Sequence, residues 1–171
     1  MTGSLASAAR EVILHSRYHI GVAVAAPTGL MVPVVKDADK KDLATIAADI
    51  DRLSNDAKAG RIKIDDLRGG TFTVTSIGGI GGLISTPIIN HPEVAILGVH
   101  KIKQAPVVRD GQIVIRDVGN FSVSLDHRIV DAFAPHHLVS DVVDRRGFRW
   151  DRSPWVFQFI EHRQHLVHRA Q

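Results

Sequence analysis

The sequence predicts an α+β fold in which antiparallel strand pairing dominates. Several short β-rich runs are separated by glycine and proline turns, and one long segment spaces its apolar residues as a helix does. No regular β-α-β alternation appears along the chain. The length of 171 residues fits one domain, and a hydrophobic content of 44% provides enough apolar side chain for a core.

Two β-rich runs begin the pattern, at 18–25 and 30–37. Between them stand Pro27 and Gly29, which favour a turn. Pro33 lacks a backbone N–H group and cannot donate to a neighbouring strand. We therefore expect its strand to lie at a sheet edge or to carry a bulge.

Residues 42–59 predict an amphipathic helix that ends near Gly60. Apolar residues recur there at spacings of three and four: Leu43, Ile46, Ala47, Ile50 and Leu53.

The middle of the chain returns to strand patterns. Residues 69–76 alternate as a strand, and 77–92 are rich in glycine and proline, which predicts an irregular connection. Residues 93–102 predict another apolar strand. Residues 105–118 predict a β-hairpin, because an Asp-Gly pair at their centre favours the positive φ angles of a tight turn.

A final strand, 120–127, runs into a cluster of ionisable residues. Residues 131–144 predict a helix whose start is limited by Pro135. After Asp144 the composition changes, because this segment holds both tryptophans and a dense population of arginine and histidine. We therefore divide the chain into a body, 1–144, and an atypical tail, 145–171.

The net charge of +3 arises in the tail. The body has 15 Lys and Arg against 16 Asp and Glu, whereas the tail has 6 against 2. A body without a basic surplus argues against nucleic-acid binding. The absence of cysteine excludes disulfides, thiolate zinc sites and a cysteine nucleophile. Because neither a membrane-length apolar run nor a secretory signal is seen, we expect a soluble, intracellular protein. Separately, we expect no catalytic metal, since metal ligands normally need a fixed set of supporting partners.

His127 is the first candidate site residue. An imidazole has an ordinary pKa near 6.5 and can act as a base at neutral pH. Asp131 follows four residues later, one helical turn on, where it can orient the base or a neighbouring arginine. Asp126 and Arg128 flank the histidine. The pattern leaves two readings open, a working base or a histidine held only by backbone hydrogen bonds.

Thr75 and Ser76 form the second candidate, at the end of the strand 69–76. By the two-residue period of a strand, Thr73 and Thr75 share one face and Ser76 lies on the other. A hydroxyl beside glycines can approach a ligand closely and donate to a developing oxyanion. The alternative is that the threonines reflect β propensity alone. No helix pattern follows the glycines, so a dinucleotide-binding loop is not expected.

The octet LDHRIVDA resembles the His-x-x-x-Asp-Gly signature of the dihydrolipoamide acyltransferases, which form the cores of 2-oxo acid dehydrogenase complexes and have chloramphenicol acetyltransferase among their relatives. Three stretches follow that family's order and spacing: YHIGVAVAAPTGLMVPVVKDADKKDLATIAADIDRLS, DLRGGTFTVTSIGGIGGLISTPIINHPEVAILGVHKI and VSLDHRIVDA. The resemblance covers roughly residues 10–144.

The resemblance implies transfer of an acyl group between a dihydrolipoyl thiol and coenzyme A, with no metal. In this reading His127 is the general base, Thr75 is the oxyanion donor, and Asp131 orients the site through an arginine. Ser76 and Ser54 match positions that contact coenzyme A in some members. The lipoyl group comes from a separate domain or chain.

The same resemblance implies a two-layer sandwich, in which helices cover one face of a mixed, mainly antiparallel sheet. It also implies homotrimers that share active sites and build a larger core, together with lipoyl domains and the other components of the complex. The family's catalytic domain starts earlier, so we expect the body to be an N-terminally truncated domain. Location would be cytoplasmic in a bacterium or the mitochondrial matrix in a eukaryote.

Two departures keep a second function open. Ala132 stands where the family signature has glycine, and the tail resembles nothing in the family. The alternative is a non-catalytic core or assembly protein, or an inactive fragment, of the same fold. For an active enzyme, the motif SIGGIGG gives acetyl a slight preference over succinyl or branched-chain acyl groups.

Overall fold

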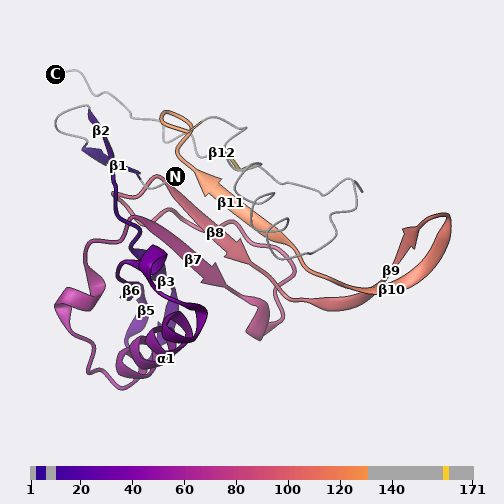
Figure 1. The fold of residues 1–171 in the computed structure, drawn as a ribbon, viewed down its shortest axis with the longest axis horizontal. Coiled ribbons are helices and arrows are strands. Elements are labelled where there is room, and N and C mark those ends of the chain that lie inside the picture. The colour runs from indigo at the N-terminus through magenta and orange to yellow at the C-terminus, as the bar shows by residue number, and fades with distance from the viewer. Residues whose placement is uncertain (1–2, 7–10, 131–159, 162–171) are drawn as a thin grey trace.

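The computed structural model describes residues 3–6, 11–130 and 160–161. A six-stranded sheet forms its centre (Figure 1). In order across the sheet, the strands are β12 (Ile160–Glu161), β11 (Phe121–Leu125), β8 (Ala95–Val99), β7 (Phe72–Ser76), β3 (Ile20–Val22) and β6 (Val34–Val35). The predicted α+β class with a mixed sheet is confirmed.

The described strands pair in both antiparallel and parallel directions. Five of the eight pairs among the described strands are antiparallel, but within the six-stranded sheet β7–β8, β3–β7 and β11–β12 are parallel. The crossover from β7 to β8 contains only a 3₁₀ turn, η3 (Gly78–Ile80), and no α-helix. For this reason the sequence shows no β-α-β alternation although part of the sheet is parallel.

The two predicted strands before the helix are each divided. The first gives β3 and β4 (Val24–Ala26), and the second gives β5 (Gly29–Met31) and β6. Pro33 lies at the second break, and its carbonyl accepts a 2.8 Å hydrogen bond from the Val22 amide. Since β6 lies at the edge of the six-stranded sheet, the expected edge position beside Pro33 is confirmed.

The predicted helix is α1 (Leu43–Lys58). The Asp42 side chain caps its first turn by accepting a 2.7 Å hydrogen bond from the Thr45 amide. After the last turn Gly60 adopts a φ of 68°, which glycine tolerates without strain. Two further 3₁₀ turns flank the helix, η1 (Ala38–Lys40) and η2 (Ile64–Leu67).

The α1 helix packs against β4 and β6. Its fully buried residues are Leu53 and Ala57. Leu43, expected on the apolar face, is 65% exposed because it lies in the first turn, beyond the reach of the sheet. The buried face is therefore shifted toward the C-terminal half of the helix.

The predicted hairpin forms β9 (Lys103–Arg109) and β10 (Gln112–Val118). Asp110 and Gly111 make its turn with φ angles of 50° and 75°, as the Asp-Gly pair predicts. The hairpin projects from the body as a long arm (Figure 1). A second hairpin, β1 (Gly3–Ala6) with β2 (Glu11–Leu14), begins the described chain.

One hydrophobic cluster of the core lies on one face of the sheet. It consists of Phe72, Val94, Ala95, Leu125 and Val130, flanked by Ile20, Val74, Leu97 and Ile129. The opposite face carries threonine and serine. The predicted helix 131–144 lies outside the described residues, as does the tail apart from β12.

Candidate active site

Thr75 lies near the end of β7 on the polar face of the sheet. Its Cα is paired with that of Gly98 on β8. Thr73, two residues earlier on the same face, is fully buried and donates a 2.7 Å hydrogen bond to the Glu93 carboxylate. Thr75 is only partly buried, and its hydroxyl forms no hydrogen bond with any described residue. Of the two threonines, Thr75 therefore has the available hydroxyl.

Ser76 and Ser54 do not join Thr75 on this face. Ser76 is exposed and points to the other side of the sheet, by the strand period. Ser54 is partly buried in α1, which packs mainly against β4 and β6. Their contacts with coenzyme A remain predictions.

The predicted ionisable cluster forms a tight turn directly after β11. The Asp126 amide donates to the Val94 carbonyl at 2.9 Å, and the Asp126 carbonyl accepts from the amides of Ile129 and Val130 at 3.0 Å. Since Ile129 and Val130 pack against the core, the turn is anchored to the body.

Within this turn Asp126 and Arg128 pair with each other. The guanidinium donates from Nε at 2.9 Å and from Nη2 at 2.5 Å, and the Arg128 amide adds a 3.1 Å bond to the same carboxylate. The hydrogen bond from the Arg128 side chain holds the pKa of Asp126 below its ordinary value. His127 is exposed between them, with no hydrogen bond to any described residue. Its ring is therefore open to a substrate.

Asp131, the predicted partner of this site, lies outside the described residues. Its orienting role, and any effect of Ala132 beside it, remain predictions.

Thr75 and His127 of one chain lie toward opposite ends of the sheet. β7 runs parallel to β8, and β11 runs antiparallel to it. Thr75 is therefore level with Gly98, whereas Leu125 is level with Ala95. Three residues of β8 separate these levels, about 10 Å at the usual rise of a strand. His127 follows Leu125 by two residues, beyond that end of β8.

A buried histidine, His100, also lies on the polar face, and no local sequence pattern singles it out. Its side chain is next to that of Ser122, with Nε2 2.9 Å from Oγ, and the residue is only 3% exposed. Its Nδ1 has no hydrogen-bond partner among the residues that the structure describes, and burial lowers the pKa of the ring. Gly98 leaves room for the pair, since a Cβ there would lie 2.4 Å from the Ser122 Oγ.

Glu93 is the second buried titratable residue that sequence reasoning missed. It is 5% exposed, and it accepts hydrogen bonds from Thr73 and from the Asn90 amide group, at 2.7 and 3.2 Å. Burial raises the pKa of its carboxyl. Only the three-dimensional pairing of β7 with β8 brings Glu93 and Thr73 together, so no local pattern identifies them.

Two further properties bear on the site. Across the described ranges, no group of three histidine, aspartate or glutamate side chains is arranged to hold a metal ion. Among the helices of the same ranges, none is long and apolar enough to cross a membrane.

Residues 1–143 match the family of 2-oxoacid dehydrogenases acyltransferase catalytic domains. The chain belongs to this family. Among curated acyltransferases, the chain is 46% identical to the dihydrolipoyllysine-residue succinyltransferase component of the Cupriavidus necator 2-oxoglutarate dehydrogenase complex. That alignment covers 71% of this chain and 29% of the relative.

Other acyltransferases match to a similar degree. The lipoamide acyltransferase component of the Pseudomonas putida branched-chain alpha-keto acid dehydrogenase complex is 46% identical, in an alignment that covers 72% of this chain and 29% of the relative. The dihydrolipoyllysine-residue acetyltransferase component of the Staphylococcus aureus pyruvate dehydrogenase complex is 44% identical, in an alignment that covers 76% of this chain and 30% of the relative. The chain thus spans about 30% of the length of these acyltransferases.

Solved acyltransferase structures share the fold. The Azotobacter vinelandii dihydrolipoamide acetyltransferase superposes with a TM-score of 0.75 at 37% identity, over 84% of this chain and 59% of that one. That structure belongs to an investigation of a serine, a histidine and an asparagine in its catalytic mechanism. A probable dihydrolipoamide acetyltransferase of Listeria monocytogenes superposes with a TM-score of 0.77 at 37% identity, and the match covers 89% of this chain and 64% of that one.

Proposed function

We propose that this acyltransferase-family chain transfers an acyl group between a dihydrolipoyl thiol and coenzyme A within a 2-oxo acid dehydrogenase complex. Residue spacing is the observation that carries the proposal. In the Azotobacter acetyltransferase, 52 positions separate the serine from the histidine, and the asparagine follows four positions later. Here 52 positions separate Thr75 from His127, and Asp131 follows four positions later.

His127 supplies the base. Its exposed ring takes the proton from the coenzyme A thiol, and the resulting thiolate attacks the carbonyl carbon of the acyl-dihydrolipoyl thioester. The carbon–sulfur bond to the lipoyl group then breaks, and His127 returns the proton to the departing thiolate. The products are acyl-coenzyme A and the free dihydrolipoyl group, and His127 ends unchanged.

Thr75 stabilises the intermediate of this reaction. The tetrahedral adduct carries negative charge on the former carbonyl oxygen, and the unengaged Thr75 hydroxyl donates to it. Losing one such donor typically lowers kcat by about 10²–10³-fold. Thr73 does not compete for this role, because its hydroxyl is bound to Glu93.

The separation of Thr75 from His127 supports a site that is shared by two copies of the chain. Both groups must approach a single thioester to about 3 Å, which is incompatible with their positions at opposite ends of one sheet. In our proposal the histidine of one subunit acts with the threonine of the next, in a trimer that builds a larger core. A solved relative, the pyruvate dehydrogenase complex core, is cubic, with a TM-score of 0.75 at 37% identity.

The remaining predicted residues have supporting roles in this proposal. Asp131 orients the site through an arginine, and Ser76 and Ser54 contact coenzyme A. The lipoyl group arrives on a separate domain or chain. We also propose acetyl as the preferred acyl group, although the matching relatives include succinyl, branched-chain and acetyl enzymes.

The direct test is coenzyme A-dependent transfer from acyl-dihydrolipoamide by the purified chain. We expect turnover that falls by about 10²–10⁴-fold in the variant His127→Ala. Unchanged activity in that variant would exclude His127 as the base. Acetyl, succinyl and branched-chain donors compared at equal concentration report the preference through kcat/KM, and a higher value for succinyl would refute the acetyl proposal.

A further inference from the structure

Lys101 lies just beyond the strand end that carries Thr75. Thr75 on β7 is paired with Gly98 on β8, and three residues lead from Gly98 to Lys101. Lys101 is exposed, and its side-chain amine forms no hydrogen bond or ion pair within the described part of the chain. The residue therefore places an unpaired amine next to the hydroxyl that is proposed to hold the acyl group.

Backbone contacts fix the position of Lys101 relative to Thr75. The Lys101 amide donates to the Gly82 carbonyl at 3.0 Å, so the turn that follows β7 closes on this residue. Gly78, in the same turn, packs against the peptide that joins His100 to Lys101. A Cβ on Gly78 would lie 3.3 Å from the Lys101 nitrogen. The segments that leave β7 and β8 thus remain side by side.

The length of a lysine side chain matches this position. Three residues of backbone span at most about 10 Å, which limits the distance from the level of Thr75 to the Lys101 Cα. An extended lysine side chain covers about 6 Å, because a four-carbon stem separates Cα from the amine. A thioester whose carbonyl oxygen accepts from the Thr75 hydroxyl has its carbonyl carbon about 3–4 Å from that hydroxyl. The Lys101 amine can therefore reach this carbon.

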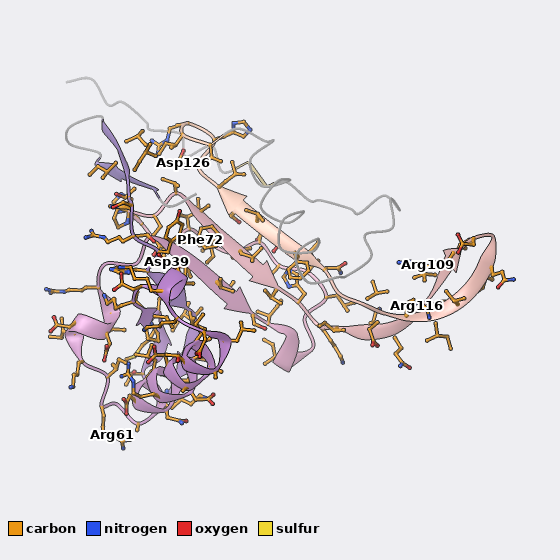
Figure 2. The ribbon with its side chains drawn as sticks, viewed as in Figure 1. Asp39, Arg61, Phe72, Arg109, Arg116 and Asp126 are labelled. Carbon is orange, nitrogen blue, oxygen red and sulfur yellow. The ribbon has the colours of Figure 1, made fainter. Side chains whose placement is uncertain are left out.

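The position of Lys101 distinguishes it from the other six lysines of the chain. Lys103 is two residues further on, about 7 Å along an extended chain, and begins the β9–β10 arm. Figure 2 shows Asp39 and Arg61 on the helical side of the molecule, opposite the arm that Arg109 marks. The remaining five lysines belong to the segment that contains Asp39 and Arg61: Lys36, Lys40, Lys41, Lys58 and Lys63.

We propose that Lys101 is a site of self-acylation, at which an acyl thioester held by Thr75 transfers its acyl group to the lysine amine. The inference rests on the proposed function for the identity of the donor. The lysine first gives a proton to solvent, and the lone pair of the free amine attacks the carbonyl carbon. The carbon–sulfur bond then breaks, and the departing thiolate takes a proton from the attached nitrogen. The products are acyl-lysine and a free thiol.

Thr75 serves both reactions, and His127 serves only one. Attack by an amine and attack by a thiolate both place negative charge on the former carbonyl oxygen, to which the Thr75 hydroxyl donates. An unprotonated amine is already a nucleophile, so it does not need the base that makes a thiolate. Acylation also replaces an exposed cation with a neutral amide beside the site. The modification therefore records which acyl group the site has held.

Incubation of the purified chain with acetyl-coenzyme A, followed by peptide mass spectrometry, tests the proposal. We expect the acetyl group to appear on Lys101 at least about tenfold faster than on Lys103, Lys58 or Lys63, because Lys101 alone among them lies within reach of the bound thioester. The comparison needs no variant, and all seven lysines lie within the described residues. Equal labelling of Lys101 and Lys103 overturns the proposal.

Variants of Thr75 test whether the acyl group comes from this site. Thr75→Ala should slow the labelling of Lys101 by about tenfold or more and leave that of Lys103 unchanged. Thr75→Ser, which keeps a hydroxyl, should retain most of the labelling. A Lys101 rate that is the same in all three chains contradicts the proposal. Far-UV circular dichroism identifies an unfolded variant, in which case the comparison of lysines within the unaltered chain decides.

Two further variants separate self-acylation from the proposed transfer to coenzyme A. His127→Ala should lose acyl transfer and still label Lys101. Lys101→Arg should lose the label and keep its initial rate of transfer, and the matched control Lys103→Arg should keep both. A chain that transfers acyl groups without labelling Lys101 refutes the self-acylation alone, whereas a chain that labels Lys101 without transfer refutes the proposed function alone.

Discussion

The Thr73 hydroxyl donates a 2.7 Å hydrogen bond to the Glu93 carboxylate, and the two residues are 0% and 5% exposed. This bond ties β7 to the chain just before β8, two residues from Thr75. Asn90 binds the other carboxylate oxygen at 3.2 Å, so both oxygens of Glu93 are engaged. Burial raises the pKa of Glu93 and outweighs the hydrogen bonds from Thr73 and Asn90, which act in the opposite direction because they favour the carboxylate.

Glu93→Gln should preserve this clamp between Thr73 and Glu93, and Glu93→Ala should break it. Glutamine fills the same volume and keeps an acceptor for Thr73, and a turn of the Asn90 amide lets its oxygen accept from the glutamine NH2 group. Alanine leaves the buried Thr73 hydroxyl without its partner, which should lower the free energy of unfolding by about 1–3 kcal/mol. Chemical denaturation of the two variants and the unaltered chain measures the difference. A Glu93→Ala variant as stable as Glu93→Gln would show that the clamp contributes nothing.

The pH dependence of the same variants follows from the direction of the Glu93 pKa. A carboxyl whose pKa is raised in the folded state binds more protons folded than unfolded, between its ordinary value and the raised one. Stability should therefore fall as pH rises through that interval and then become level. Glu93→Gln should remove this fall. Thermal unfolding between pH 4 and about 8 tests the sign, and a parallel curve for the glutamine variant would refute it.

Gly98→Ala should destabilise the polar face. The new Cβ would lie 2.4 Å from the Ser122 Oγ and 3.3 Å from the His100 ring, so the buried pair must move. Such overpacking costs about 1–3 kcal/mol. Ser122→Ala removes the closest clash, so the double variant should recover much of the loss. Denaturation of the four chains gives the coupling energy, and additive effects of the two changes would exclude this contact as the cause.

Elements with strong local signals were predicted well from the sequence. The helix begins and ends within one residue of its expected limits, because the Asp42 cap and Gly60 mark its ends. The Asp110-Gly111 turn is found where the pair predicts it. By contrast, the parallel pairing of β7 with β8 depends on a crossover of irregular backbone, for which no periodic pattern exists. The buried stripe of α1 also depends on which strands lie beneath it.

The candidate site was predicted only in part. Thr75 could be selected because a hydroxyl at a strand end has a local signature, and the strand period separates it from Ser76. His100 and Glu93 could not, because their partners Ser122 and Thr73 lie 22 and 20 residues away in the chain. The distance between Thr75 and His127 likewise depends on strand register, which the sequence alone does not show.

Asp126→Asn should loosen the turn that carries His127. The side-chain hydrogen bond from Arg128 lowers the pKa of Asp126 in the folded state. The stabilisation is thus fully present above the ordinary pKa of 3.8, and it is lost as pH falls through the lowered folded value. Thermal unfolding from pH 5 downward should show this loss in the unaltered chain and a shallower one in Asp126→Asn. Coincident curves would indicate that the pair does not contribute.

The shared site makes a quantitative prediction for mixed assemblies. Thr75→Ala and His127→Ala should each be nearly inactive alone. When equal amounts of the two are refolded together, about one quarter of the sites should combine an intact threonine with an intact histidine from the neighbouring chain. Activity should therefore return to about one quarter of the unaltered level.

A second mixture distinguishes sites that span two chains from sites that are built within one chain. The double variant Thr75→Ala/His127→Ala, refolded with an equal amount of the unaltered chain, should retain about one quarter of full activity if each site spans two chains. Sites built within one chain would instead retain about one half, and would give no activity when the two single variants are mixed. The first outcome follows from the opposite positions of Thr75 and His127 along β8; the second would require one chain to bring them together.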